Sequence, residues 1–273
     1  LAAWITDPEN GAGHLLARVF VNRLWQHHFG RGIVATPSDF GERGERPTHP
    51  ELLDWLASEL IRHDWHLKPI HKLIMMSAAY QCSSAPNEVN EAVDGENRYF
   101  WRQERRRLEG EVIRDALLAV GQRLDRRMLG PGTLDPGQRR RSIYFTVKRS
   151  QLVPMMQVFD APEALTGVGE RPSTTIAPQA LMLMNDMHVR DCAIEFARSL
   201  MHETDAEPAR FVDEGYLTAV GRRPDELERS SALRFMADQQ ASYAESGKPN
   251  PTELALADFC QVLMCLNEFV YIE

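Results

Sequence analysis

The chain has 273 residues, of which 43% are apolar and 26% charged, and its formal net charge is −8. These values are ordinary for a globular protein and exclude collagen-like and wholly disordered chains. No apolar run approaches the roughly 18 residues that a membrane-spanning helix needs, so we expect no membrane span. The chain begins at Leu1 without a charged-then-apolar leader. We therefore expect an excerpt of a longer precursor.

The four cysteines do not follow the spacing of a zinc finger or of a haem attachment motif. Cys260 and Cys265 stand five residues apart in a helical pattern, which turns the two thiols toward different faces of the helix. We expect free, mostly buried cysteines, and no cofactor held by this chain itself.

Helical periodicity dominates the first part of the sequence. Apolar residues trace one face over 15–29, where Gly30 stops the helix, and a Gly/Pro-rich connector follows over 31–47. Thr48 and Glu51 have the spacing of a capping box that opens the next helix. A short helix is expected near 73–80, and the polar residues 83–97 predict a surface loop.

The second part begins near residue 98. Apolar residues recur every four positions over 108–124, which predicts a long helix. Residues 142–148 are dense in β-branched and aromatic side chains and form the only convincing strand. After an irregular stretch the helical pattern returns, over 189–200, 211–220, from Pro224 onward and over 254–266. We predict a mainly α, irregular multi-helix domain with at most a small β-hairpin. It is one domain, with sub-blocks at about 1–97 and 98–273 that share one core.

Several short sequence motifs, each present once, follow one another in a characteristic order along nearly the whole chain. They stand at 17–32, 39–41, 48–56, 106–115, 140–144, 159–162, 178–185, 221–224 and 267–272. Together they resemble the planctomycete PSD1 domain family, a domain of unknown function catalogued as DUF1553. The resemblance implies an exported protein, periplasmic or extracellular. Its precursor would carry an upstream partner domain and often a cytochrome c module, so that haem c would belong to a separate domain. It brings no established catalytic residues.

Residues 102–149 form a basic island, with thirteen cationic side chains against six acidic ones in an otherwise acidic chain. In one interpretation, guanidinium groups tie the fold together by pairing with carboxylates. In the other, part of the island binds an anionic ligand. The candidate ligand-binding residues are Arg107, Arg114, Arg140, Arg141 and Tyr144. Nucleic acid is not expected, because the chain is acidic overall and carries no nucleic-acid-binding motif.

The weak catalytic candidates are Asp39, His49, Glu111 and Asp115. Glu111 and Asp115 stand at i and i+4, where they form either an acid/base pair or part of an ion-pair ladder. The loop that holds Asp39 and His49 is expected to converge with the basic island. The histidines lack any metal-binding spacing, so no metal site is predicted.

Four polar residues interrupt apolar helices near the two ends of the chain: Asn22, Arg23, Asn267 and Glu268. Polar groups buried without partners are costly. We therefore expect these side chains to bond to one another or to loop backbone, and to fix the packing of both ends in one core. A cleft lined by the same residues is the alternative.

Three functions remain open from the sequence. The first is an exported module that handles an anionic or carbohydrate ligand. The second is an accessory or docking domain for a cytochrome c module, and the third is a structural or interaction domain of the cell envelope. The sequence leaves open whether the chain is an enzyme.

Overall fold

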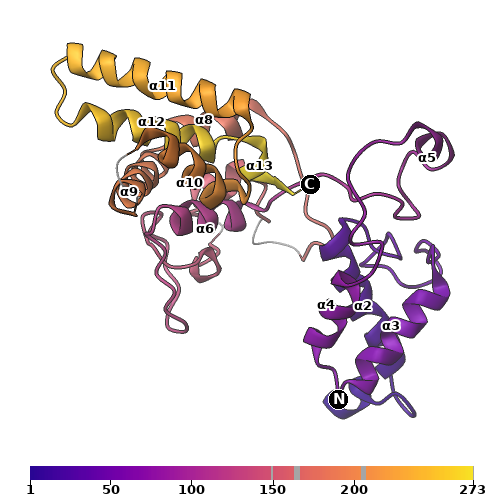
Figure 1. Cartoon of the computed structure of the whole chain (residues 1–273). Coiled ribbons are helices and arrows are strands. Elements are labelled where there is room, and N and C mark those ends of the chain that lie inside the picture. Colours follow the sequence, from indigo (N-terminus) through magenta and orange to yellow (C-terminus); the bar gives the residue numbers. More distant parts are fainter. Residues whose placement is uncertain (149, 163–166, 204–206, 273) are drawn as a thin grey trace. The chain divides into compact units, whose positions relative to one another are not determined.

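The computed structural model describes the chain except for residues 149, 163–166, 204–206 and 273 (Figure 1). The chain divides into two compact units. The first holds Leu1–Arg106 and Gly167–Glu170, and the second holds the other described residues from Arg107 onward. Both units are built mainly from helices, which confirms the predicted mainly α fold. None of the helices described is long and apolar enough to cross a membrane.

The first unit consists of helices and long connections. Its helices are α1 (Ala2–Thr6), α2 (Gly13–Phe29), α3 (Pro50–Arg62), α4 (Leu67–Met75) and α5 (Glu88–Val93). Helix α2 packs against α3 and α4, and an aromatic cluster closes the core at its C-terminal end. There Trp25 stacks on Phe29 at 4.3 Å between ring centroids, and Phe100 meets the Trp25 ring edge-on at 5.2 Å. These rings bury a large apolar area, so they anchor the long connections to the helices.

The turn after α2 is fixed by one buried amide. The Asn22 side chain is fully buried, accepts from the Val34 backbone N–H at 2.8 Å and donates to the Val34 carbonyl at 3.0 Å. A Cβ at Gly32 would lie 2.7 Å from the Asn22 amide nitrogen, so this close approach requires glycine. Gly30 ends the helix with a φ of +83°. The Asn22 side chain of α2 therefore fixes the backbone of the following loop at Val34.

The second unit is a layered helical bundle in which α12 packs against both α9 and α11 (Figure 1). Its helices are α6 (Gly110–Val120), α7 (Pro154–Val158), α8 (Ala177–Asn185), α9 (Met187–Glu203), α10 (Pro208–Val220), α11 (Glu226–Glu245), α12 (Pro251–Met264) and α13 (Asn267–Val270). A short 3₁₀ turn, η1, spans Ser142–Tyr144. Strands β1 (Arg106–Arg107) and β2 (Tyr271–Ile272) form a two-stranded sheet.

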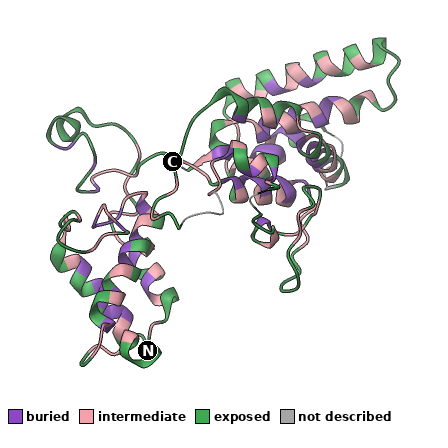
Figure 2. Cartoon of the chain, turned by 180° about the vertical axis from the view of Figure 1, so that it is seen from behind, coloured by how far each residue is buried: buried purple, intermediate pink, exposed green. Residues whose placement is uncertain are grey.

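The core of the second unit forms where α9, α10 and α12 bring their apolar faces together. Phe196, Leu256 and Leu263 are almost fully buried there. Figure 2 shows the buried residues of this unit gathered in the packed helices, while α11 carries mostly exposed and half-buried residues. Each unit thus has a buried cluster of its own. The core shared by both ends of the chain stays a prediction, which truncation before Pro251 tests: a shared core would make the whole chain unfold.

The strand predicted at 142–148 is wrong. Residues 142–144 form the 3₁₀ turn η1, and the following residues make only isolated bridges, from Phe145 to Thr133 and from Lys148 to Gln151. The cause is Asp115, whose Oδ1 accepts both the backbone N–H and the hydroxyl of Ser142 at 2.7 Å. This anchoring bends the backbone at the position where a strand would begin.

One helix end, one short helix and one capping box also differ from the prediction. The long helix predicted to reach 124 ends at Val120, because the chain turns at Gly121, where a Cβ would lie 2.9 Å from the Cys192 Cα. The loop predicted at 83–97 contains α5, which is capped by the Asn87 side chain. The N-cap of α3 is His49 and makes no side-chain capping bond, so the predicted capping box is absent.

Candidate functional site

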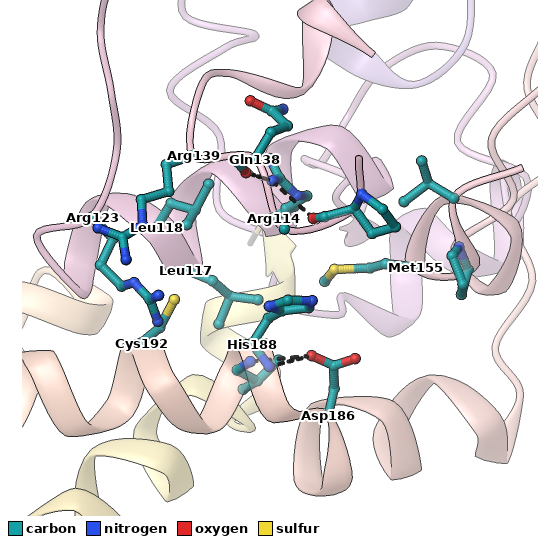
Figure 3. Close-up of a pocket in the computed structure, with 15 residues that line it drawn as sticks. Arg114, Leu117, Leu118, Arg123, Gln138, Arg139, Met155, Asp186, His188 and Cys192 are labelled. Atoms are coloured by element: carbon teal, nitrogen blue, oxygen red, sulfur yellow. Dashed lines mark hydrogen bonds between the residues drawn. The ribbon is translucent and has the colours of Figure 1, made fainter. Parts of the chain in front are cut away.

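The second unit contains a cavity of about 290 Å³ between α6, the start of α9, the start of α7 and the segment 136–139 (Figure 3). Apolar groups form most of its surface: Leu117, Leu118, Pro136, Val153, Pro154, Met155, Val189 and Cys192. The polar residues that line it are Arg114, Arg123, Gln138, Arg139, Asp186 and His188. The lining combines an apolar interior with several hydrogen-bond donors, as small-molecule sites commonly do.

Arg114 holds one wall of the cavity in place. Its side chain leaves α6, is 7% exposed as a residue, and donates to the carbonyls of Arg140 at 3.2 Å, Pro136 at 3.4 Å and Gln138. It also donates to the Ser142 hydroxyl at 3.2 Å. Burial lowers the pKa of the Arg114 guanidinium, yet an arginine stays charged in proteins. This cation therefore fixes the backbone of the wall.

Arg123 lies at one end of the cavity (Figure 3), and its side chain is 16% exposed. One terminal nitrogen, Nη1, lies 3.0 Å from the Asp191 carboxylate, but the buried Nε has no hydrogen-bond partner among the described residues. The buried Nε2 of Gln138 also lacks a partner in the described part of the chain. Buried donors are nearly always satisfied in folded proteins. Because both nitrogens are themselves buried, they do not mark a binding position, and Arg123 contributes positive charge to the cavity rather than a free donor.

Cys192 contributes an apolar, unreactive surface to the same end of the cavity. Burial raises the pKa of its thiol to about 11, although the neighbouring Arg123 opposes this shift. Because only the thiolate is a good nucleophile, the protonated thiol at neutral pH acts as a small apolar group.

Asp186 and His188 lie together in Figure 3, at the start of α9. The Asp186 Oδ1 accepts the backbone N–H groups of His188 at 2.7 Å and Val189 at 3.2 Å, so the carboxylate caps the helix. The His188 residue is exposed. The acid is thus engaged with backbone, and its negative charge occupies the end of the helix that would attract an anion.

The structure brings only one of the five predicted ligand-binding residues, Arg114, into this cavity. Arg107 lies in a buried ion pair, 2.7 Å from Asp160. Arg140 stacks on the Tyr144 ring at 3.5 Å. Arg141 has a half-exposed side chain 3.8 Å from the Asp115 carboxylate. Most of the described arginines of the basic island are thus tied to the fold, and the binding of an anionic ligand by the island stays a prediction.

The predicted acids and bases are also engaged in local structure. Glu111 accepts two bonds from Arg171, at 2.9 and 3.1 Å, and Asp115 holds Ser142. Asp39 accepts the Gly41 backbone N–H at 3.0 Å, and His49 Nδ1 lies 3.0 Å from the Thr48 hydroxyl. Asp39 and His49 belong to the first unit, whereas Glu111 and Asp115 belong to the second. Their convergence stays a prediction.

The polar residues near the C-terminus have partners within the second unit. Glu268 accepts two bonds from Arg222, at 2.6 and 2.7 Å, and Arg222 binds Glu228 in the same way. Asn267 and, in the first unit, Arg23 are exposed. Arg222 belongs to the motif at 221–224, one of those that carry the family resemblance. That motif was the sequence signal that could have pointed to Arg222.

Sequence reasoning missed Arg123 and Gln138 as site residues. No spacing or motif marks them, because only the fold brings these residues to the cavity. Among the described residues, no three His, Cys, Asp or Glu side chains gather in a way that could hold a metal ion. The predicted absence of a metal awaits elemental analysis.

We compared the chain with models of protein families, with curated proteins and with solved structures. A family model described as PSD1, a protein of unknown function (DUF1553), matches residues 1–236. No curated protein and no solved structure matches the chain.

Proposed function

The chain belongs to the PSD1 family of proteins of unknown function (DUF1553), and we propose that its second unit binds a small organic anion in the cavity of Figure 3. The observation that carries this proposal is that two cationic side chains, Arg123 and Arg139, border a cavity whose lining is otherwise mainly apolar. A carboxylate or similar group would be attracted to both cations. Hydrogen bonds between a guanidinium and an anionic oxygen are among the strong ones in proteins.

The rest of the lining supports a ligand with an apolar body. Leucine, valine, methionine and proline side chains dominate the surface. The described residues that line the cavity include no phenylalanine, tyrosine or tryptophan on which a sugar ring could stack. The cavity volume of about 290 Å³ lies just below the range of ordinary ligand sites, which begins at roughly 300 Å³. We therefore favour a small amphipathic carboxylate over a carbohydrate.

Arg139 strengthens the anionic preference. Its side chain lines the cavity from an exposed position and has no acidic partner among the described residues. The acid on the opposite side, Asp186, is engaged as the cap of α9. An anion that enters would thus meet two cations, Arg123 and Arg139.

Binding is favoured over catalysis by the state of the reactive groups. The Cys192 thiol is protonated at neutral pH because burial raises its pKa to about 11. The Asp186 carboxylate is occupied by backbone N–H groups. General acid/base or nucleophilic chemistry needs such a group to be both available and poised near the working pH.

Calorimetry with octanoate, octanol and sulfate tests the proposal, because these probes separate the charge from the apolar body. We expect octanoate to bind more tightly than either of the other two. Arg123→Met should weaken octanoate by at least about tenfold, the equivalent of about 1.4 kcal/mol. Arg127→Met is the matched control, because Arg127 is exposed, pairs with Asp125 and does not line the cavity.

The outcomes separate clearly. Absence of octanoate binding, or equal affinity of the wild type and Arg123→Met, would overturn the proposal. Thermal melts of both variants establish that the comparison is made between folded proteins. Preferential binding of a neutral sugar would instead support the carbohydrate hypothesis.

From the family alone, we infer that the chain comes from a planctomycete and acts in the periplasm or outside the cell. Haem c would then belong to a separate cytochrome c module, and this chain would hold no cofactor. Purified protein should therefore lack a Soret band and stoichiometric transition metal. Docking to the upstream partner domain or to the cytochrome c module, and a structural role in the cell envelope, are the competing proposals.

A further inference from the structure

Two adjoining segments of the second unit expose large apolar side chains. Met128 is 68% exposed, Leu129 79%, Ile143 71% and Val147 66%. Backbone bonds hold the segments side by side, from the Thr133 N–H to the Tyr144 carbonyl at 2.9 Å and from the Thr146 N–H to the Thr133 carbonyl at 2.8 Å. The segments that carry the four side chains therefore adjoin each other.

The same region is strongly basic. Residues 126–148 contain six cationic side chains and one acidic one, in a chain whose net charge is −8. Arg126, Arg139 and Lys148 are exposed and have no acidic partner among the described residues. In the second unit most other arginines pair with carboxylates, as Arg222 does with Glu228 and Glu268. Exposed cations without an acidic partner and exposed apolar side chains thus occur together in the segment 126–148.

The backbone that presents these side chains is held from within. Arg140 stacks on the Tyr144 ring at 3.5 Å and donates to the carbonyls of Pro131, at 3.1 Å, and Leu129. The Tyr144 hydroxyl accepts the Leu129 backbone N–H at 2.6 Å. Met128, Leu129 and Ile143 are therefore exposed on an anchored segment.

We propose that residues 126–148 form a docking surface for membranes that contain anionic lipids. Cations near such a membrane are attracted to its negative surface potential. Exposed leucine, isoleucine, methionine and valine side chains gain by entering the boundary between headgroups and acyl chains. A soluble polyanion would satisfy the cations but would leave the apolar side chains in water. The combination of both kinds of side chain favours the lipid surface.

The proposal does not depend on the cavity ligand. Residues 136–139 line the cavity, but the apolar side chains at 128–129, 143 and 147 do not. Membrane docking can therefore fail while octanoate binding holds, and the reverse is equally possible.

Sedimentation with large vesicles tests the docking surface, with phosphatidylcholine alone compared with phosphatidylcholine that contains phosphatidylglycerol. We expect binding only to the anionic vesicles, and weaker binding as salt rises. Leu129→Ser combined with Ile143→Ser should weaken it strongly. Arg126→Glu combined with Lys148→Glu should weaken the binding to anionic vesicles by at least about tenfold, since each cation near the membrane surface contributes to the binding free energy.

The matched control is Leu227→Ser combined with Arg234→Glu on α11. Leu227 is 75% exposed and the Arg234 side chain 86% exposed, but both lie outside 126–148. This control should sediment like the wild type, and thermal melts should show all variants folded, because every changed side chain is exposed. The proposal is overturned if the wild type stays in solution with anionic vesicles at low salt, or if the control loses as much binding as the two test variants. Binding to heparin or single-stranded DNA without binding to vesicles would also overturn it, in favour of a soluble polyanion.

Discussion

Arginine side chains at two places in the second unit have different partners and different roles. At the junction of α10, α11 and α13, Arg222 lies between Glu228 and Glu268, and all its contacts to them are 2.6 or 2.7 Å long. At the cavity, Arg114 binds backbone carbonyls, and Arg123 keeps a buried donor without a partner. The first cluster is complete within the chain, whereas the second is not.

Because every arginine carries the same charge, the groups that bind an arginine side chain indicate its role better than its charge does. A guanidinium between two carboxylates has its charge balanced and its donors occupied, so it has little affinity for a further ligand. A guanidinium that binds neutral carbonyls, or that lacks a partner, leaves positive potential in its surroundings. The cavity and the segment 126–148 both carry cations of this second kind.

The largest expected effect comes from removing the cation that holds the cavity wall. Arg114→Met should lower the free energy of unfolding by about 3 kcal/mol, because it leaves several carbonyls without their charged donor. Urea denaturation measures the change. Arg141→Met is the control and should stay within about 0.5 kcal/mol, since exposed ion pairs contribute little. Equal losses in the two variants would show that Arg114 is not the clamp.

A smaller effect is expected at the complete cluster. Glu228→Gln should lower the free energy of unfolding by about 1–2 kcal/mol at pH 7, because the carboxylate accepts two bonds from Arg222. Those bonds hold the pKa of Glu228 at about 2, below its ordinary 4.5. A depressed pKa contributes stability above pH 4.5 that is lost as the pH falls toward 2.

The pH dependence gives a second readout of the same variant. The difference in stability between the wild type and Glu228→Gln should shrink as the pH falls from about 4.5 to about 2, measured by urea denaturation at each pH. Glu226→Gln, an exposed acid in the same first turn of α11, is the control and should show only a small change. A difference that persists undiminished at pH 2 would contradict the assignment.

The smallest effect is chemical and leaves the fold unchanged. Because the pKa of the Cys192 thiol is about 11, its alkylation by iodoacetamide should be slow at pH 7 and rise about tenfold per pH unit up to pH 10. Peptide mass spectrometry follows it, with the half-buried Cys82 of the first unit as the internal comparison. Octanoate should protect Cys192 and not Cys82. Rapid labelling of Cys192 at neutral pH would show a reactive thiol and reopen a catalytic interpretation.

The helices were predictable where an apolar stripe is long and local. The stripe over 15–29 corresponds to α2, and the one over 254–266 corresponds closely to α12. The strand at 142–148 failed because β propensity describes the fit of side chains to a sheet, and here Asp115 holds Ser142 in a turn. Local preference was overridden by one contact between residues 27 positions apart.

The candidate site was less predictable than the fold. Arg114 was identified from the basic island, and the structure adds its role as a clamp on the wall. Arg123 and Gln138 carry no local signal, since an unpaired donor is defined by what surrounds it after folding. The partner of Glu268 lies 46 residues away, at Arg222, and spacing along the chain does not reveal it.

The sequence by itself determined the mainly helical fold, the course of the longer helices and membership of the PSD1 family, because periodicity and ordered motifs are properties of neighbouring residues. Only the tertiary structure decided which arginines are satisfied by carboxylates, which hold backbone and which remain open to a ligand. The physical reason is that the free energy of a charge depends on its burial and on the groups within a few ångströms of it. For Arg114, Arg123 and Arg222 those groups come largely from distant parts of the chain.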